Sequence, residues 1–118
     1  MEYQSDYILR LIEQMGALIR RAMERLGASD NAAAYEFAGQ AISEALDVDP
    51  ELVDRLSPAS LRSLVELANL DSRAIVLVAD AFDLQSLALE RSGSLLEAQA
   101  MRQNAELVRG LGDPGRAN

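Results

Sequence analysis

Apolar residues recur at intervals of three and four positions along the first quarter of the chain. This spacing places them on one face of an α-helix, whereas a half-buried strand alternates at every second residue. The stripe comprises Ile8, Leu11, Ile12, Met15, Leu18, Ile19, Ala22 and Leu26. It predicts a first helix of about six turns, and Gly27 is expected to end it.

The composition also favours helices over sheet. Aromatic residues make up 4% of the 118 residues and threonine is absent, whereas alanine, leucine, glutamate and arginine are frequent. Ser29 or Asp30 can cap a second helix. Its apolar stripe comprises Ala34, Phe37, Ala38, Ala41, Ile42 and Ala45. Because the turn between the two helices is short, they are expected to form a hairpin.

Proline marks two further helix starts. Pro50 and Pro58 each follow a capping residue, Asp or Ser, and the missing N–H of proline costs nothing in the first turn of a helix. The first of these helices is predicted to be short and to end near Leu56. The second should end just before Asp71, which can cap the helix that follows.

Residues 73–91 are the one segment in which a strand competes with a helix. Residues 74–80 alone resemble a buried parallel strand, but no other segment offers a partner strand. The apolar pattern continues at helical spacing to Leu89 and covers most of the helix circumference, so this helix should be central. Gly93 is expected to end it, and a capping box over 94–97 to start the last helix.

The chain length predicts a single domain with its own core. We assign a helical domain to residues 1–110 and a flexible tail to the glycine-containing residues 111–118. Charged residues interrupt the N-terminal apolar pattern, so neither a signal peptide nor a transmembrane span is predicted there. A cytoplasmic location is the simplest expectation.

The formal net charge of −8 is unevenly distributed. Residues 1–27 carry equal numbers of acids and bases, whereas residues 30–54 contain carboxylates and no basic residue. The acids of this acidic segment are Asp30, Glu36, Glu44, Asp47, Asp49, Glu51 and Asp54. Their field would repel phosphate backbones and anionic lipid, so neither nucleic acid nor a membrane is expected as a partner.

Several residue types that support catalysis are missing. The chain has no histidine, cysteine or lysine, and all 11 basic residues are arginine. The chain therefore lacks the residues of the common nucleophile–base pairs and of thiolate or imidazole metal sites. It also lacks the lysine needed for a Schiff base or for the standard phosphate-binding loop. The sequence predicts a protein that is not an enzyme and binds no cofactor or metal.

Two groups of acids are candidate chemical sites. Residues 47–54 hold four carboxylates, but a calcium-binding EF-hand loop that starts at Asp47 would have Leu52 and Pro58 where it needs glycine and glutamate. Helix capping explains these acids without a metal. Asp80 and Asp83 lack the accompanying carboxylates or histidines of a metal or acid–base site, so solvation or pairing with arginine is expected.

The first helix contains the strongest candidate interaction surface, because its apolar face is wider than one neighbouring helix covers. The candidate residues are Tyr3, Tyr7, Ile8, Leu11, Ile12, Met15, Leu18 and Ile19. The face either packs across two helices of the same chain or meets a second copy or a partner protein. Arg20, Arg21 and Arg25 are candidate contacts for an anion or for the acidic segment of a second copy, or they compensate the helix C-terminus.

Two segments resemble tetratricopeptide repeats in the placement of their small residues. Residues 89–105 read Leu-x3-Gly-x-Leu-x2-Ala-x6-Ala, and residues 35–50 read Tyr-x2-Ala-x6-Ala-Leu-x3-Pro, like the second half of such a repeat. Phe82 and Ser86 also fit the aromatic and small positions of the pattern. The opening Asp6–Gln14 (DYILRLIEQ) resembles an uncharacterised bacterial family of small helical proteins. The repeat resemblance implies a scaffold that binds other proteins or itself.

Together these patterns predict an all-α domain of five to six helices in antiparallel hairpins, arranged as a tetratricopeptide-like right-handed stack. The expected function is a non-catalytic protein–protein interaction module that forms a homodimer or binds a protein partner. The alternative is a small helical ligand-binding protein or enzyme subunit that uses only carboxylates and arginine.

Overall fold

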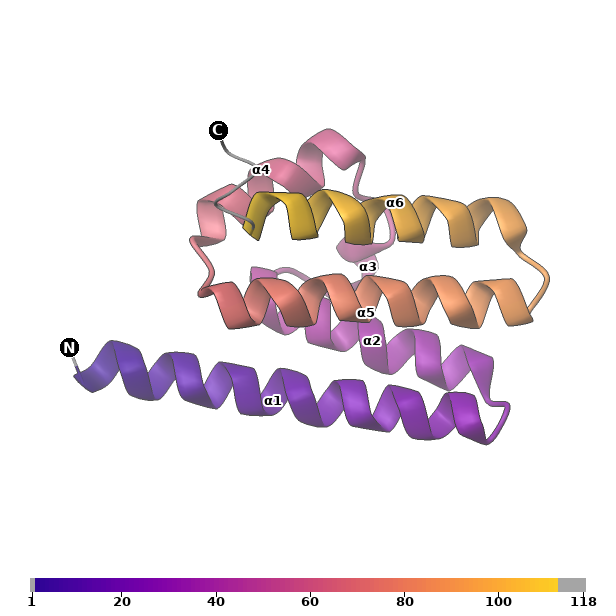
Figure 1. The fold of residues 1–118 in the computed structure, drawn as a ribbon, viewed down its shortest axis with the longest axis horizontal. Helices are drawn as coiled ribbons and strands as arrows, with labels where there is room; N and C mark the ends of the chain where they lie inside the picture. Colours follow the sequence, from indigo (N-terminus) through magenta and orange to yellow (C-terminus); the bar gives the residue numbers. More distant parts are fainter. Residues whose placement is uncertain (1, 113–118) are drawn as a thin grey trace.

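The computed structural model describes residues 2–112, and over this range the chain forms six α-helices and no strand (Figure 1). The helices are α1 (Glu2–Gly27), α2 (Asn31–Leu46), α3 (Pro50–Val53), α4 (Pro58–Ala68), α5 (Ser72–Arg91) and α6 (Leu95–Gly112). α1 and α2 form one antiparallel hairpin, and α5 and α6 form another. The all-α prediction is confirmed.

α5 is the central helix of the molecule, as predicted. It packs against α1, α2 and α6, while α4 covers α6 and the short α3 lies against α2 (Figure 1). The strand-like residues 74–80 form the first turns of this helix. A helix with neighbours on three sides buries most of its circumference, which explains why its apolar pattern is so broad.

Polar side chains begin the helices at three of the predicted positions. Asp30, Ser57 and Asp71 accept hydrogen bonds from backbone N–H groups at 3.2, 3.1 and 2.9 Å, respectively. Asp49 precedes α3 in extended backbone conformation but its side chain makes no capping bond.

The predicted end of the short third helix near Leu56 is wrong, because α3 stops at Val53. The N–H groups of Arg55 and Leu56 donate to carbonyls three residues back rather than four. The chain therefore closes in tighter turns before Pro58, which disfavours helical geometry in the residue that precedes it.

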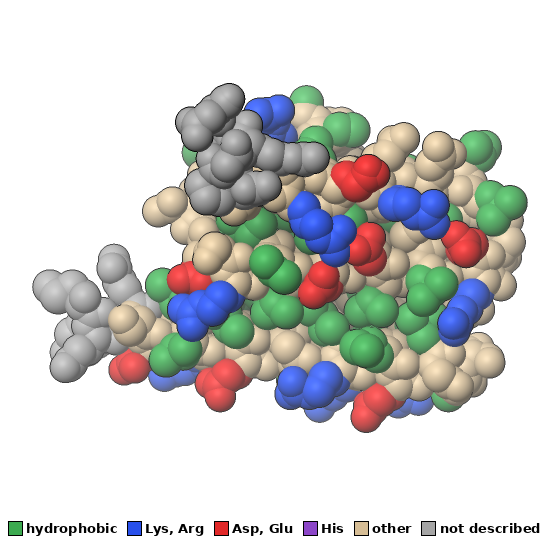
Figure 2. Space-filling view, in the orientation of Figure 1, with side chains coloured by type: hydrophobic (Ala, Val, Ile, Leu, Met, Phe, Trp, Pro, Cys, Tyr) green, Lys and Arg blue, Asp and Glu red, His purple; other side chains and the backbone are tan. Residues whose placement is uncertain are grey.

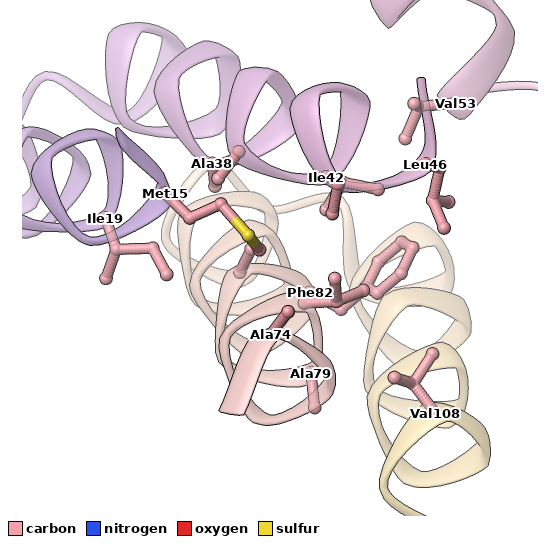
Figure 3. Close-up of a cluster of buried hydrophobic side chains, with 14 of the residues drawn as sticks. Met15, Ile19, Ala38, Ile42, Leu46, Val53, Ala74, Ala79, Phe82 and Val108 are labelled. Atoms are coloured by element: carbon pink, nitrogen blue, oxygen red, sulfur yellow. The ribbon is translucent and has the colours of Figure 1, made fainter. Parts of the chain in front are cut away.

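The hydrophobic core lies where the two hairpins meet. Its largest fully buried apolar side chains are Met15, Ile42, Leu61, Val78, Phe82 and Val108. Figure 3 shows Phe82 of α5 between Ile42 of α2 and Val108 of α6, with Met15 of α1 pointing toward α5. Burial of an aromatic ring and several aliphatic chains, each contributing about 1.5–3 kcal/mol, drives the packing of all the long helices into one core.

Small residues and two long-range hydrogen bonds hold the helices close together. Ala38 and Ala45 of α2 and Ala98 and Ala105 of α6 are buried, so neighbouring helices can approach closely. The Ser86 hydroxyl of α5 donates to the carbonyl of Ala98 at 2.7 Å. The Arg91 guanidinium donates to the carbonyl of Leu26 at 3.1 Å and so joins the ends of α5 and α1.

The last helix extends past the predicted domain boundary. α6 continues to Gly112, and Leu111 packs against the core, so residues 111 and 112 belong to the helix rather than to a tail. A Cβ atom at residue 112 would lie 2.6 Å from Cγ2 of Ile75, so a larger residue here would force the Ile75 side chain to move. The rest of the predicted tail, residues 113–118, lies outside the described residues. None of the helices between residues 2 and 112 is long and apolar enough to cross a membrane.

Candidate binding groove

The structure divides the apolar stripe of α1 into a buried and a less buried part. Leu11, Met15 and Ile19 lie in the core, where α1 contacts both α2 and α5. This is the packing within one chain that the sequence left open, and it removes these three residues from any exposed surface. Of the other candidates, Ile8, Ile12 and Leu18 are half-buried and Tyr7 is 66% exposed. The side chain of Tyr3 lies outside the described residues.

The arginine cluster of α1 is exposed. Arg20, Arg21 and Arg25 form no ion pair with any described residue. The guanidinium carbons of Arg21 and Arg25 each lie 6.0 Å from the centroid of the Phe37 ring of α2, at the outer limit of a cation–π contact. The three cations are therefore available to an external anion.

Asp80 and Asp83 are paired with arginine, as expected. Both carboxylates accept hydrogen bonds from Nη2 of Arg109 in α6, at 3.0 and 2.5 Å. The hydrogen bond to Asp83 is the largest cause that raises the pKa of the Arg109 guanidinium, and the hydrogen bond to Asp80 raises it further. These half-exposed ion pairs tie α5 to α6.

The acidic segment does not form a calcium-binding loop, and part of it lines a groove beside α2. Within residues 5–112, no three acidic side chains are grouped so that they could hold a metal ion. Several of these acids instead border two adjoining cavities, which lie between α2, α3 and the α5–α6 hairpin. In the view of Figure 1, α2 and α3 lie behind α5 and α6. We refer to the two cavities together as the acidic groove.

The first cavity, of about 390 Å³, is called the Gln85 cavity. It is lined by Tyr35, Glu36, Gly39, Gln40, Pro50, Glu51, Asp54 and Gln85. Three of its lining residues are acids and none is basic. Gln85 is fully buried, and its Nε2 donates to the backbone carbonyl of Tyr35 at 3.3 Å. The Oε1 atom of the same amide is also buried but has no hydrogen-bond partner in the described part of the chain.

The second cavity, of about 550 Å³, is called the Asn104 cavity. It is lined by Tyr35, Asp54, Leu56, Pro58, Leu89, Glu97, Ala100, Met101, Gln103 and Asn104. It is more apolar than the first, because it includes leucine, methionine and proline side chains. Its acids are Asp54 and Glu97, and the buried Asn104 adds an amide. No basic residue is among these lining side chains either.

Tyr35 and Asp54 border both cavities. The Tyr35 hydroxyl donates to Oδ1 of Asp54 at 2.8 Å and so links α2 to the end of α3, 19 residues further along the chain. Burial raises the pKa of Tyr35, and the hydrogen bond to Asp54 and the negative charges of Asp54 and Glu97 raise it further. The cavities are lined by Glu36, Glu51, Asp54 and Glu97 and by no basic residue, so the groove has a negative potential, which favours a cationic ligand.

Sequence reasoning noted Glu36, Glu51 and Asp54 as part of an acidic segment but missed Glu97, Tyr35, Gln85 and Asn104. One signal was available for Gln85, because a polar residue interrupts the buried side of a helix that is otherwise apolar most of the way round. Buried polar groups are normally hydrogen-bonded, so such a residue deserves a functional or structural explanation. The spatial approach of residues 35, 54 and 85 could not be read from the sequence.

No protein-family model matches this sequence, and no curated protein or solved structure is similar enough to indicate a relationship. The comparisons therefore identify no family, and the geometry of the acidic groove is the basis for a functional proposal.

Proposed function

We propose that this chain is a non-catalytic protein–protein interaction module that binds a positively charged segment of a partner protein in the acidic groove. The observation that carries the proposal is the lining of the two cavities, where Glu36, Glu51, Asp54 and Glu97 face no basic residue. Uncompensated carboxylates at a concave site attract cations over a long range and favour their binding. The absence of histidine, cysteine and lysine supports a non-catalytic role.

The shape of the groove supports an extended ligand with more than one side chain. Cavities of about 390 and 550 Å³ adjoin at Tyr35 and Asp54, and both are within the range of pockets that hold small ligands or side chains. The Gln85 cavity offers mostly polar groups, whereas the Asn104 cavity adds apolar surface. A peptide with a cationic residue next to an apolar residue would match this division.

A tetratricopeptide-like arrangement of the two hairpins is part of the proposal. α5 packs on both helices of the preceding hairpin, as expected when one helical repeat stacks on the next. The buried alanines of α2 and α6 are those that carry the resemblance to the repeat. In this interpretation α3 and α4 are an insertion between two repeat-like units, and the groove lies where the insertion meets them.

Self-association is a second component, supported by the outer surface of α1. Tyr7 and Met23 remain 66% and 57% exposed after the chain has folded. Figure 2 shows hydrophobic side chains gathered along the boundary between α1 and α5. A homodimer could cover this apolar surface. We test it by light scattering after size exclusion over a hundredfold range of concentration, where a mass near 12.8 kDa throughout would contradict the dimer.

The alternative function is a small ligand-binding protein, and one observation favours it. Tyr35, Asp54 and Gln85 converge from α2, the end of α3 and α5 on one cavity, which is typical of a site for a discrete polar molecule. The negative lining would then select a free organic cation. Nucleic acid and membranes remain unexpected partners because of the same acidity, and a cytoplasmic location remains our expectation.

The test is calorimetric titration with a blocked octapeptide of alternating arginine and serine. We expect binding that is weakened at least tenfold in the triple variant Glu36→Gln, Glu51→Gln, Asp54→Asn. The matched control is Glu13→Gln, Glu24→Gln, Glu106→Gln, which removes the same charge from exposed acids outside the groove.

Equal losses in the two triple variants would mean that only net charge matters, and the groove proposal would be wrong. Absence of binding to wild-type protein would contradict it as well. If arginine amide alone binds as tightly as the octapeptide, the free-ligand alternative replaces the partner protein.

A further inference from the structure

We infer that the Gln85 cavity is a specific subsite for the guanidinium group of an arginine side chain in the bound segment. This inference rests on the proposed function and adds the identity of the side chain that the groove selects. The evidence for it is the unpartnered side-chain oxygen of Gln85, whereas the evidence for the proposed function is the set of acids around the groove.

Gln85 presents a hydrogen-bond acceptor that the folded chain leaves unused. Its Nε2 is engaged by the carbonyl of Tyr35, which fixes the orientation of the amide and identifies the free atom as oxygen. Oε1 is buried and has no partner among the described residues. A buried acceptor without a donor is energetically costly, and a ligand that supplies the donor recovers that cost on binding.

The amide lies at the wall of the Gln85 cavity. Nε2 contacts Tyr35, and a Cβ atom built on Gly39 would lie 3.1 Å from Nε2. Tyr35 and Gly39 both line the cavity, as does Gln85 itself. The lack of a side chain at residue 39 therefore lets the Gln85 amide pack directly against α2 at the wall of this cavity.

The acceptors around this cavity match a guanidinium group better than an ammonium group. Asp54 uses Oδ1 to accept from Tyr35, so its Oδ2 is available. Glu51 of α3 and Gln85 of α5 supply further oxygens. Guanidinium carries five N–H donors in one plane and is weakly hydrated, so it can bond several acceptors at once. The Tyr35 ring at the cavity wall also offers a surface on which a planar cation can stack.

The experiment compares three blocked octapeptides in which serine alternates with arginine, lysine or citrulline. Citrulline keeps the shape of arginine but has no charge. We expect the arginine peptide to bind at least tenfold more tightly than the lysine peptide, and the citrulline peptide not to bind. The side-chain N–H₂ resonances of Gln85, assigned by their loss in Gln85→Met, should shift with the arginine peptide alone.

Two substitutions test the subsite itself. Gln85→Met removes the unused acceptor while keeping a side chain of similar size, and it should reduce the arginine preference to less than threefold. Gly39→Ala places a methyl group about 3.1 Å from Nε2, which displaces the amide, and it should have the same effect if Gln85→Met does not fold. Glu106→Gln, on an exposed position of α6 outside the groove, should leave the preference unchanged.

The outcomes separate this inference from the proposed function. Equal binding of the arginine and lysine peptides, unaffected by Gln85→Met, would overturn the guanidinium subsite and leave the acidic groove as a general site for basic segments. If none of the three peptides binds, both proposals fail. Loss of the arginine preference in both groove variants, with Glu106→Gln unchanged, supports the subsite.

Discussion

Two neighbouring residues of α5 show how the α5–α6 interface differs from the acidic groove. Ser86 and Gln85 are both buried and polar, but Ser86 donates a hydrogen bond to Ala98, whereas Gln85 leaves one of its two polar atoms without a partner. Buried polar groups in folded proteins are nearly always paired. The polar group at residue 86 in the α5–α6 interface is therefore satisfied within the chain. In the groove, Oε1 of Gln85 is a buried acceptor to which a ligand could donate a hydrogen bond.

The largest expected effect is the loss of stability when a side chain of the hydrophobic core is removed. Phe82→Ala removes a ring that is 1% exposed at the centre of the core, so we expect the free energy of unfolding to fall by about 3–5 kcal/mol. Urea denaturation followed by circular dichroism measures this change. Leu67→Ala on α4, where the side chain is 81% exposed, is the control and should change the value by less than about 0.5 kcal/mol.

Substitutions at the adjacent positions 85 and 86 test whether the two buried polar side chains differ in their contribution to stability. Ser86→Ala loses a satisfied buried hydrogen bond and should destabilise the protein by about 1 kcal/mol. Gln85→Met loses one bond but also removes an unpartnered oxygen, so the change should stay within about 0.5 kcal/mol. Urea midpoints of the two variants decide the order. A larger loss for Gln85→Met would mean that Gln85 has a structural role like that of Ser86.

The hydrogen bond between Tyr35 and Asp54, which border both cavities, should affect the pH dependence of stability. Because the folded protein raises the pKa of Tyr35, ionisation of this tyrosine is easier in the unfolded chain. The corresponding stability is fully present below the unfolded value near pH 10 and is lost as the pH rises toward the folded value. Between pH 9 and 11 the urea midpoint of wild type should therefore fall further than that of Tyr35→Phe. Parallel falls would contradict the assignment.

The smallest expected difference concerns helix capping on the two sides of α3. Ser57 accepts a hydrogen bond from the N–H of Ser60, so Ser57→Ala should cost about 0.5–1 kcal/mol. Asp49 makes no such bond, so Asp49→Ala should change stability by less than about 0.3 kcal/mol. Thermal denaturation of the two variants provides the comparison. Equal losses would show that Asp49 caps α3 in solution.

Much of the fold was predictable because local patterns agreed with one another. The stripe of α1, the caps at Asp30, Ser57 and Asp71, and the breadth of the α5 pattern each depend on residues close together in the sequence. Helix positions follow from periodicity and capping, which are local properties. Predicted ends were less accurate where tertiary contacts extend or shorten a helix, as Leu111 does for α6.

The candidate site was predictable only in its charge. The sequence by itself determined that residues 30–54 are acidic and that the chain lacks the residues of common catalytic sites. Only the tertiary structure brought Tyr35, Asp54 and Gln85 together, from positions 19 and 50 residues apart. It also decided that Leu11, Met15 and Ile19 belong to the core. These outcomes depend on which helix faces cover one another, and helical periodicity specifies an apolar face without specifying its neighbour.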